Sequence, residues 1–222
     1  MIRQIIFDYD GVFTNDDYTA VSQVLSESSG IPKNKIEGLI GVHERKYVLA
    51  PNSKQFLNAL KEEFNYPGTD KEMVRLLNQR GDSGLYNEMS GFLKWKSEGN
   101  RGLSVLSNQL AYRVPYVRQE LEAHVGLEHF DRVWFSPEVG LQKPFVGVSH
   151  EDRDSAMDVS KVNIFPFAVQ QMRYLGYKPE ECVFIDDSSK NIQSANESGI
   201  NGIVFKNVEQ MFEMLKKYGV KI

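Results

Sequence analysis

Two acidic residues follow an apolar stretch close to the start of the chain. Asp8 and Asp10 come directly after Ile5–Phe7 and are followed by Gly11. Residues i and i+2 of a strand project to the same side, and a loop can also direct both carboxylates into one pocket. Two carboxylates at the end of a buried strand are costly unless something compensates their charge, and Mg²⁺ prefers carboxylate and carbonyl oxygens. The pattern therefore predicts a metal site with a carboxylate that acts as nucleophile or base.

Later apolar stretches are followed by further polar groups. These are Ser107 and Asn108 after 103–106, Lys143 after 132–135, and Asp186 and Asp187 after 182–185. An isolated Asp-x-Asp pair is more often a turn or a helix cap, an isolated lysine is usually a solvated surface residue, and a Ser-Asn pair can cap the next helix. Four signals at four strand ends favour one shared site, because ligands of open parallel sheets bind outside the carboxyl ends of the strands.

The elements that must position these groups form an alternating pattern. Buried strands are predicted at 4–7, 103–106, 132–135, 182–185 and 202–205, and amphipathic helices at 86–96, 115–125, 165–175 and 208–218. Strands that alternate with helices are typical of an α/β fold with a parallel sheet. The sequence therefore predicts a doubly wound core.

The first gap between strands is too long for a single crossover helix. From Thr14 to Gly102 we find no convincing strand, but helix signals recur: Pro32 opens one helix, Ser53 caps another, and Thr69 and Glu72 form a capping box. One βαβ crossover needs only about 30 residues. We therefore expect a small helical cap domain at 15–85, inserted into a core formed by 1–14 and 86–222.

Phosphoryl transfer is the chemistry that this set of residues indicates. Asp8 would attack phosphorus and form an aspartyl-phosphate, while Mg²⁺ holds the nucleophile and a phosphate oxygen together. Ser107 would supply a hydroxyl, and Asn108 a backbone amide, to the phosphate oxygens. Lys143 would add positive charge where negative charge gathers in the transition state. Asp10 would protonate the leaving oxygen and then activate water.

Composition limits the binding partners and the cellular compartments that we expect for this protein. The 222 residues carry a formal net charge of −4 and one cysteine, Cys182, within an apolar stretch. This balance gives no basic surface for nucleic acid or anionic lipid and no intrachain disulfide. The N-terminus lacks a signal-peptide pattern, and no stretch approaches the roughly 18 apolar residues of a membrane span. We expect a cytoplasmic protein without nucleic-acid or membrane partners, as a monomer or weak homodimer.

The motifs resemble those of the haloacid dehalogenase-like (HAD) hydrolase superfamily, in the branch with a helical cap. Asp8-Tyr9-Asp10-Gly11-Val12 is similar to its DxDGV/T motif, and Ser107 to its second-motif Ser/Thr. Lys143-Pro144 resembles the third motif, and Asp186-Asp187 the acidic fourth motif. Any one part would be a weak signal, but the four in order cover nearly the whole chain. Within the superfamily, the sequence around Ser107-Asn108 and Asp186-Asp187 most resembles small-molecule phosphatases.

The resemblance implies a fold, an activity and a ligand set. The fold would be a Rossmann-like sheet with the first strand central and the second and fourth beside it. The activity would be Mg²⁺-dependent hydrolysis of a small phosphate ester, sugar phosphates included. The magnesium ligands would be the Asp8 carboxylate, the Asp10 backbone carbonyl and the Asp187 carboxylate. Asp186 would lie outside the ligand set. Asn191 would either have a helix-capping or surface role or hydrogen-bond to the metal site.

Three other functions fit the same fold. A 2-haloacid dehalogenase shares the nucleophile, but that branch lacks the second aspartate, and Asp10 is present here. A phosphomutase keeps the motifs but adds cap residues that we cannot match. A non-catalytic binding or regulatory protein could inherit the fold, although an intact catalytic set argues against it.

One segment departs from the family pattern and generates a prediction. In relatives a helix follows the Lys-Pro pair almost directly, but here 145–162 separates Lys143-Pro144 from Ile164. Lengthening a surface loop adds little entropic cost, so 145–162 could be a tolerated insertion. Its position after the third strand places it at the catalytic rim, where long loops often act in binding. If it tunes substrate access, shortening it will change the Michaelis constant or substrate range of the folded protein. An unchanged substrate profile would contradict this.

Overall fold

A parallel sheet forms the centre of the molecule. The computed structural model describes residues 1–15, 17–79, 81–143 and 163–222. Five strands pair in the order β5-β4-β1-β6-β7. They are β1 (Gln4–Phe7), β4 (Gly102–Ser107), β5 (Arg132–Phe135), β6 (Cys182–Asp186) and β7 (Asn201–Val204). Each predicted strand is confirmed to within one residue at its ends, and β1 is central between β4 and β6. The segment 145–162 lies outside the described residues.

The strands are apolar throughout because both faces of the sheet are covered. In β1, Ile5 and Phe7 join a cluster on one face, whereas Ile6 joins a cluster on the other. Gln4, at the start of β1, pairs in parallel with Gly102 of β4 and with Cys182 of β6. This double covering is the usual environment of parallel sheets. The doubly wound α/β class is therefore confirmed, and Cys182 is a buried thiol as expected.

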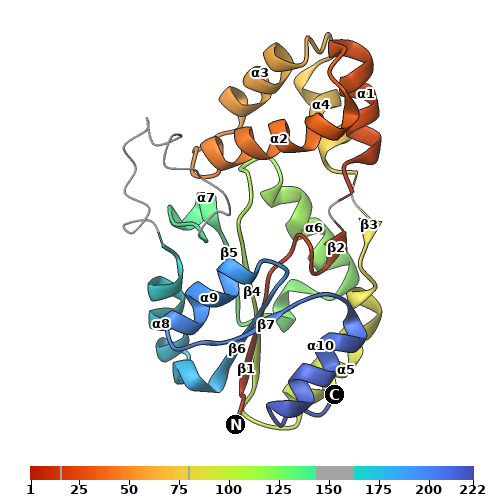
Figure 1. Cartoon of the computed structure of the whole chain (residues 1–222). Helices are drawn as coiled ribbons and strands as arrows, with labels where there is room; N and C mark the ends of the chain where they lie inside the picture. Colours follow the sequence, from red (N-terminus) through yellow and green to blue (C-terminus); the bar gives the residue numbers. More distant parts are fainter. Residues whose placement is uncertain (16, 80, 144–162) are drawn as a thin grey trace.

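Helices pack on both faces of the sheet (Figure 1). On one face lie α5 (Leu85–Ser97), α6 (Val114–His124) and α10 (Val208–Lys217), and on the other α8 (Phe165–Tyr174) and α9 (Ser189–Glu197). A short helix, α7 (Ser136–Val139), follows β5, and 3₁₀ turns occupy Leu127–His129 and Pro179–Glu181. The four helices predicted for the core are confirmed to within one residue at each end.

Four more helices form a separate helical unit between β1 and β4. They are α1 (Thr19–Ser29), α2 (Lys33–Tyr47), α3 (Lys54–Glu63) and α4 (Asp70–Leu77). Their buried side chains form a hydrophobic cluster of their own. Figure 1 shows this unit at the end of the molecule toward which β1 runs from the N-terminus. The carboxyl ends of the sheet strands therefore face the helical unit.

The boundaries of the helical unit differ from the expectation of no strand before Gly102. β2 (Thr14–Asn15) pairs antiparallel with β3 (Gly81–Asp82), so the segments that enter and leave the unit run side by side. Ser83 reinforces this junction, since its hydroxyl donates to the carbonyls of Val12 and Phe13. Two-residue strands are too short to produce a periodic pattern, which explains why the sequence did not indicate them.

The predicted capping box is confirmed, and Ser53 stands at the N-cap position of α3 as predicted but without the capping hydrogen bond. Thr69 accepts from the Glu72 amide while the Glu72 carboxylate accepts from the Thr69 amide, which is the predicted capping box. Ser53 precedes α3 but makes no side-chain cap; its hydroxyl instead accepts the Tyr112 amide at 2.7 Å. Ser53 therefore joins the helical unit to the loop after β4.

Across the described ranges, no helix combines the length and apolar character needed to cross a bilayer.

Candidate active site

A buried lysine bridges two carboxylates at the carboxyl ends of β1 and β6. Lys143 Nζ lies 2.5 Å from Asp8 Oδ2 and 2.7 Å from Asp186 Oδ2. Asp8 is 5% exposed, Lys143 2% and Asp186 0%. Because β1 and β6 are neighbours in the sheet, their two terminal aspartates meet although they are 178 positions apart. The prediction that Asp8 and Lys143 lie close together is therefore confirmed.

The charges of this cluster oppose the effect of burial. Burial would lower the pKa of the Lys143 ammonium, but the carboxylates of Asp186 and Asp8 outweigh it and raise that pKa. Burial raises the pKa of Asp8, against the attraction of Lys143, and the charges of Asp186 and Asp187 add to the increase. One ammonium among these carboxylates leaves negative charge in excess, which favours binding of a further cation.

Asp187 extends this carboxylate cluster toward the loop after β1. Carboxylate oxygens of Asp8, Asp186 and Asp187 lie within 4.8 Å of one another. Partial burial of its carboxyl group, whose side chain still reaches solvent, and the charge of Asp186 raise the pKa of Asp187. The oxygen ligands of one octahedral Mg²⁺ lie roughly 3–4 Å apart, given its metal–oxygen bonds of about 2.0–2.1 Å. The donor type and spacing therefore fit a magnesium ion with small side-chain movements.

Asp186 is saturated by donors, whereas Asp187 is exposed. Beside Lys143, the Asp186 carboxylate accepts the Ser188 amide at 2.8 Å and Asn191 Nδ2 at 3.0 Å. The two alternatives for Asn191 are thus resolved toward the site, because Ser188, not Asn191, is the N-cap of α9. These contacts suit Asp186 to hold Lys143 and leave Asp187 better placed to bind a cation.

Asn108 holds the backbone of Lys143. Its side-chain oxygen accepts the Lys143 amide at 2.8 Å and the Ser136 hydroxyl at 2.6 Å, and its Nδ2 donates to the Lys143 carbonyl at 3.2 Å. The alternative that Ser107 and Asn108 cap the next helix is wrong, because α6 begins only at Val114. Sequence reasoning gave Asn108 a backbone role and missed this side-chain role.

Asp10 lies in a polar network that the sequence did not indicate. Its Oδ1 is 2.7 Å from Arg113 Nη2 and accepts Thr14 Oγ1 at 3.2 Å, while its Oδ2 accepts Gln109 Nε2 at 2.8 Å. The same Gln109 nitrogen donates to Ser107 Oγ at 3.1 Å. Arg113 and Gln109 had no distinguishing motif, since a buried arginine in a loop resembles any surface arginine in sequence.

Solved structures share this architecture over nearly the whole chain. A HAD-family enzyme from Bacteroides thetaiotaomicron, determined with magnesium and inorganic phosphate, superposes with a TM-score of 0.67 at 21% identity over 93% of this chain and 95% of its own. A HAD-like hydrolase from Porphyromonas gingivalis gives 0.70 at 19% identity, with both chains fully covered. The chain has the haloacid dehalogenase-like fold. The recognition made from the motifs is confirmed at this level.

The HAD-like fold leaves the reaction open. An L-2-haloacid dehalogenase from Xanthobacter autotrophicus also superposes, with a TM-score of 0.54 at 17% identity over all of this chain and 85% of its own. No protein-family profile matches the chain. A chloroplast flavin mononucleotide hydrolase of Arabidopsis thaliana is 32% identical over 56 residues, which span 25% of this chain and 23% of that protein. The activity must therefore be argued from the site.

Gly11 allows the carboxylate cluster to close, and it generates a prediction. Its φ is +77°, and a Cβ there would lie 2.6 Å from Cγ and Oδ2 of Asp187. Gly11→Ala should lower the free energy of unfolding by at least the 1–2 kcal/mol typical of left-handed backbone. It should also displace Asp187 and weaken Mg²⁺ binding, as measured by calorimetry.

Gly30→Ala is the matched control. Gly30 has a φ of +73°, but its Cβ would meet nothing within 4 Å. The control should share the backbone cost and keep Mg²⁺ binding. Equal Mg²⁺ affinity in the two variants would show that Gly11 does not shape the site.

Proposed function

We propose that this chain hydrolyses a small phosphate monoester, with Mg²⁺, through an aspartyl-phosphate on Asp8. The observation that carries the proposal is the Asp8–Lys143–Asp186 bridge with Asp187 beside it, at the carboxyl ends of adjacent strands. This arrangement pairs a carboxylate nucleophile with a fixed cation and leaves carboxylate charge for a metal. These are the groups that phosphoryl transfer needs.

Asp8 is the nucleophile of the proposed reaction. Its Oδ2 is held by Lys143, and its Oδ1 accepts the Tyr9 amide at 2.7 Å, so the carboxylate has a fixed orientation. Lys143 reduces the repulsion between this carboxylate and an incoming phosphate dianion. The same ammonium offsets the charge that develops on the phosphoryl oxygens.

Ser107 and the backbone amide of Asn108 form the proposed phosphate contact. Ser107 ends β4, which neighbours β1, and its hydroxyl oxygen already accepts from Gln109 Nε2. A hydroxyl that accepts through its oxygen retains its hydrogen for donation. The Ser107 hydrogen can therefore point to a phosphate oxygen.

Magnesium would be held by the carboxylates of Asp8 and Asp187 and the backbone carbonyl of Asp10. When bound, it would supply Lewis-acid charge that draws the nucleophile and a phosphate oxygen together. Asp186, saturated by Lys143, Ser188 and Asn191, would fix the lysine instead of binding the ion.

Asp10 is the proposed acid and base. Its side chain is 23% exposed, while Asp8 is nearly buried, so Asp10 has access to water, and Gln109 links its carboxylate to Ser107. It would give a proton to the leaving oxygen in the first step and take one from water in the second. A dehalogenase has no leaving oxygen to protonate, so the presence of Asp10 favours the phosphatase.

The helical unit would act as the cap of the core, with 15–85 as its extent. The unit faces the carboxyl ends of the strands, and Leu110 and Tyr112 of the loop after β4 pack against it. Selectivity would come from this side of the site. Flavin mononucleotide belongs among the substrates to be tested, because the Arabidopsis relative is named as a hydrolase of this compound.

A substitution at Asp8 tests the nucleophile. The purified protein should hydrolyse at least one member of a panel of phosphorylated metabolites with Mg²⁺, as measured by release of inorganic phosphate. Asp8→Asn should reduce this turnover by several orders of magnitude, because it removes the attacking carboxylate. Lys143 would remain paired with Asp186 in the variant. Asp70→Asn, the same change at an exposed carboxylate, should have no effect. Turnover by Asp8→Asn near the wild-type rate would contradict the mechanism.

Chelation and a substitution at Asp187 test the metal ligands. Chelation should abolish turnover, and added Mg²⁺ should restore it. Outer ligand partners typically contribute about 10–100-fold to metal affinity, so Asp187→Asn, which removes a direct ligand, should weaken Mg²⁺ binding by at least about tenfold. Calorimetry on the variant would measure this independently of turnover. Wild-type Mg²⁺ affinity in Asp187→Asn would exclude it as a ligand.

A further inference from the structure

Arg113 is a buried cation that joins the core to the helical unit. The residue is 2% exposed and lies just before α6. Its Nη2 is 2.7 Å from Asp10 Oδ1, and its Nη1 donates at 3.3 Å both to the Leu77 carbonyl and to Asn78 Oδ1. One planar guanidinium thus contacts the proposed acid and base and the C-terminal end of α4.

Gln109 completes the support of the Asp10 carboxylate. Arg113 Nε donates to Gln109 Oε1 at 3.0 Å, and Gln109 Nε2 donates to Asp10 Oδ2 at 2.8 Å. The guanidinium therefore acts on one carboxylate oxygen directly and on the other through the glutamine amide. Donors on both oxygens fix the rotation of a carboxylate as well as its position, which is how supporting residues set the precision of a site.

The contact with α4 is favourable for the same cation. Leu77 is the last residue of α4, and the final carbonyls of a helix lack intrahelical partners. These carbonyls carry the negative end of the helix dipole, which attracts a cation. Arg113 therefore holds Asp10 on one side and satisfies the end of α4 on the other.

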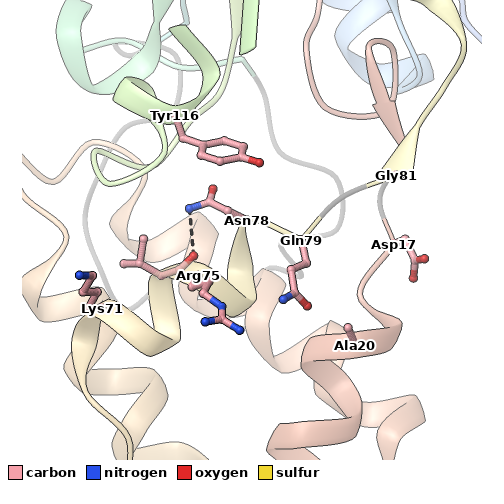
Figure 2. A pocket seen from close by; sticks show the side chains of 9 residues that line it. Asp17, Ala20, Lys71, Arg75, Asn78, Gln79, Gly81 and Tyr116 are labelled. Carbon is pink, nitrogen blue, oxygen red and sulfur yellow. Dashed lines mark hydrogen bonds between the residues drawn. The ribbon is translucent and has the colours of Figure 1, made fainter. Parts of the chain in front are cut away.

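A cavity of about 780 Å³ borders this connection. Figure 2 shows Asn78 and Gln79 from the end of α4, Asp17 and Gly81 from the two segments that connect the helical unit, and Tyr116 from α6 around it. Of these residues, Asn78 also belongs to the Arg113 network. The cavity therefore separates this part of the helical unit from Tyr116 of α6.

We infer that Arg113 is a positioning residue that orients Asp10 for the water-activating step and makes this orientation depend on the seating of the helical unit. The inference rests on the proposed function. In that step water oxygen bonds to phosphorus as the bond between phosphorus and the Asp8 oxygen breaks. The electron pair returns to the Asp8 carboxylate, phosphate leaves, and the proton from water goes to Asp10.

The test is burst kinetics of Arg113→Met with 4-nitrophenyl phosphate and Mg²⁺. The nitrophenolate leaving group needs little protonation, so formation of phospho-Asp8 should remain fast while its hydrolysis slows. We expect a burst near one nitrophenolate per active site, a kcat at least tenfold below wild type, and a KM that falls with it. Acid-quenched protein should hold more phosphate on Asp8 than wild type.

Two other variants give the comparison. Arg118→Met removes an exposed arginine of α6, which pairs with Glu138, and should keep wild-type kinetics. Arg113→Lys keeps a cation beside Asp10 without the planar fork, so it should show a smaller burst than Arg113→Met, and it serves as the test variant if methionine prevents folding. A merely structural role would reduce the active fraction and the turnover without any burst.

Asp10→Asn separates the two possible failures. It should itself give the burst, because it removes the base while retaining the backbone carbonyl. If wild type has no Mg²⁺-dependent turnover, or Asp10→Asn gives slow turnover without a burst, the proposed function is wrong. If Asp10→Asn gives a burst and neither Arg113 variant does, the inference about Arg113 alone is overturned.

Discussion

The crowding of negative charge at the ends of β1 and β6 constrains everything around it. Asp8, Asp186 and Asp187 place carboxylate oxygens within 4.8 Å of one another, and the Lys143 ammonium compensates only part of their charge. Isolated buried charges are strongly unfavourable, so each member needs a partner. The cluster therefore binds one cation from the chain, and its remaining negative charge would favour a second, divalent one.

Neighbouring residues are shaped by the need to keep that cluster together. Lys143 can be buried because its ammonium is paired twice and its backbone is held from both sides by Asn108. Gly11 can approach Asp187 because it has no Cβ. The parallel sheet makes the meeting inevitable, since adjacent strands that run in one direction end at the same edge. Such a site is costly to folding, and the proposed function would account for its arrangement.

Polar contacts join the helical unit to the loop after β4. Ser53 accepts the Tyr112 amide, and Arg113 contacts the end of α4, so the loop after β4 is anchored in both parts of the molecule. That loop also carries Gln109, which supports Asp10. The loop after β4 thus links the proposed cap to the proposed acid and base, beside a cavity.

The sequence by itself determined the sheet strands, the helices of the core, the insertion of a helical unit, and the convergence of Asp8 with Lys143. These follow from local rules, because apolar periodicity reports burial and strand ends of a parallel sheet share one edge. Only the tertiary structure decided what each side chain contacts. Ser53 accepts the Tyr112 amide, Asn108 accepts the Lys143 amide, and Arg113 donates to Asp10, 103 positions away. Such pairings depend on the paths of loops and on distances between elements, which no local pattern encodes.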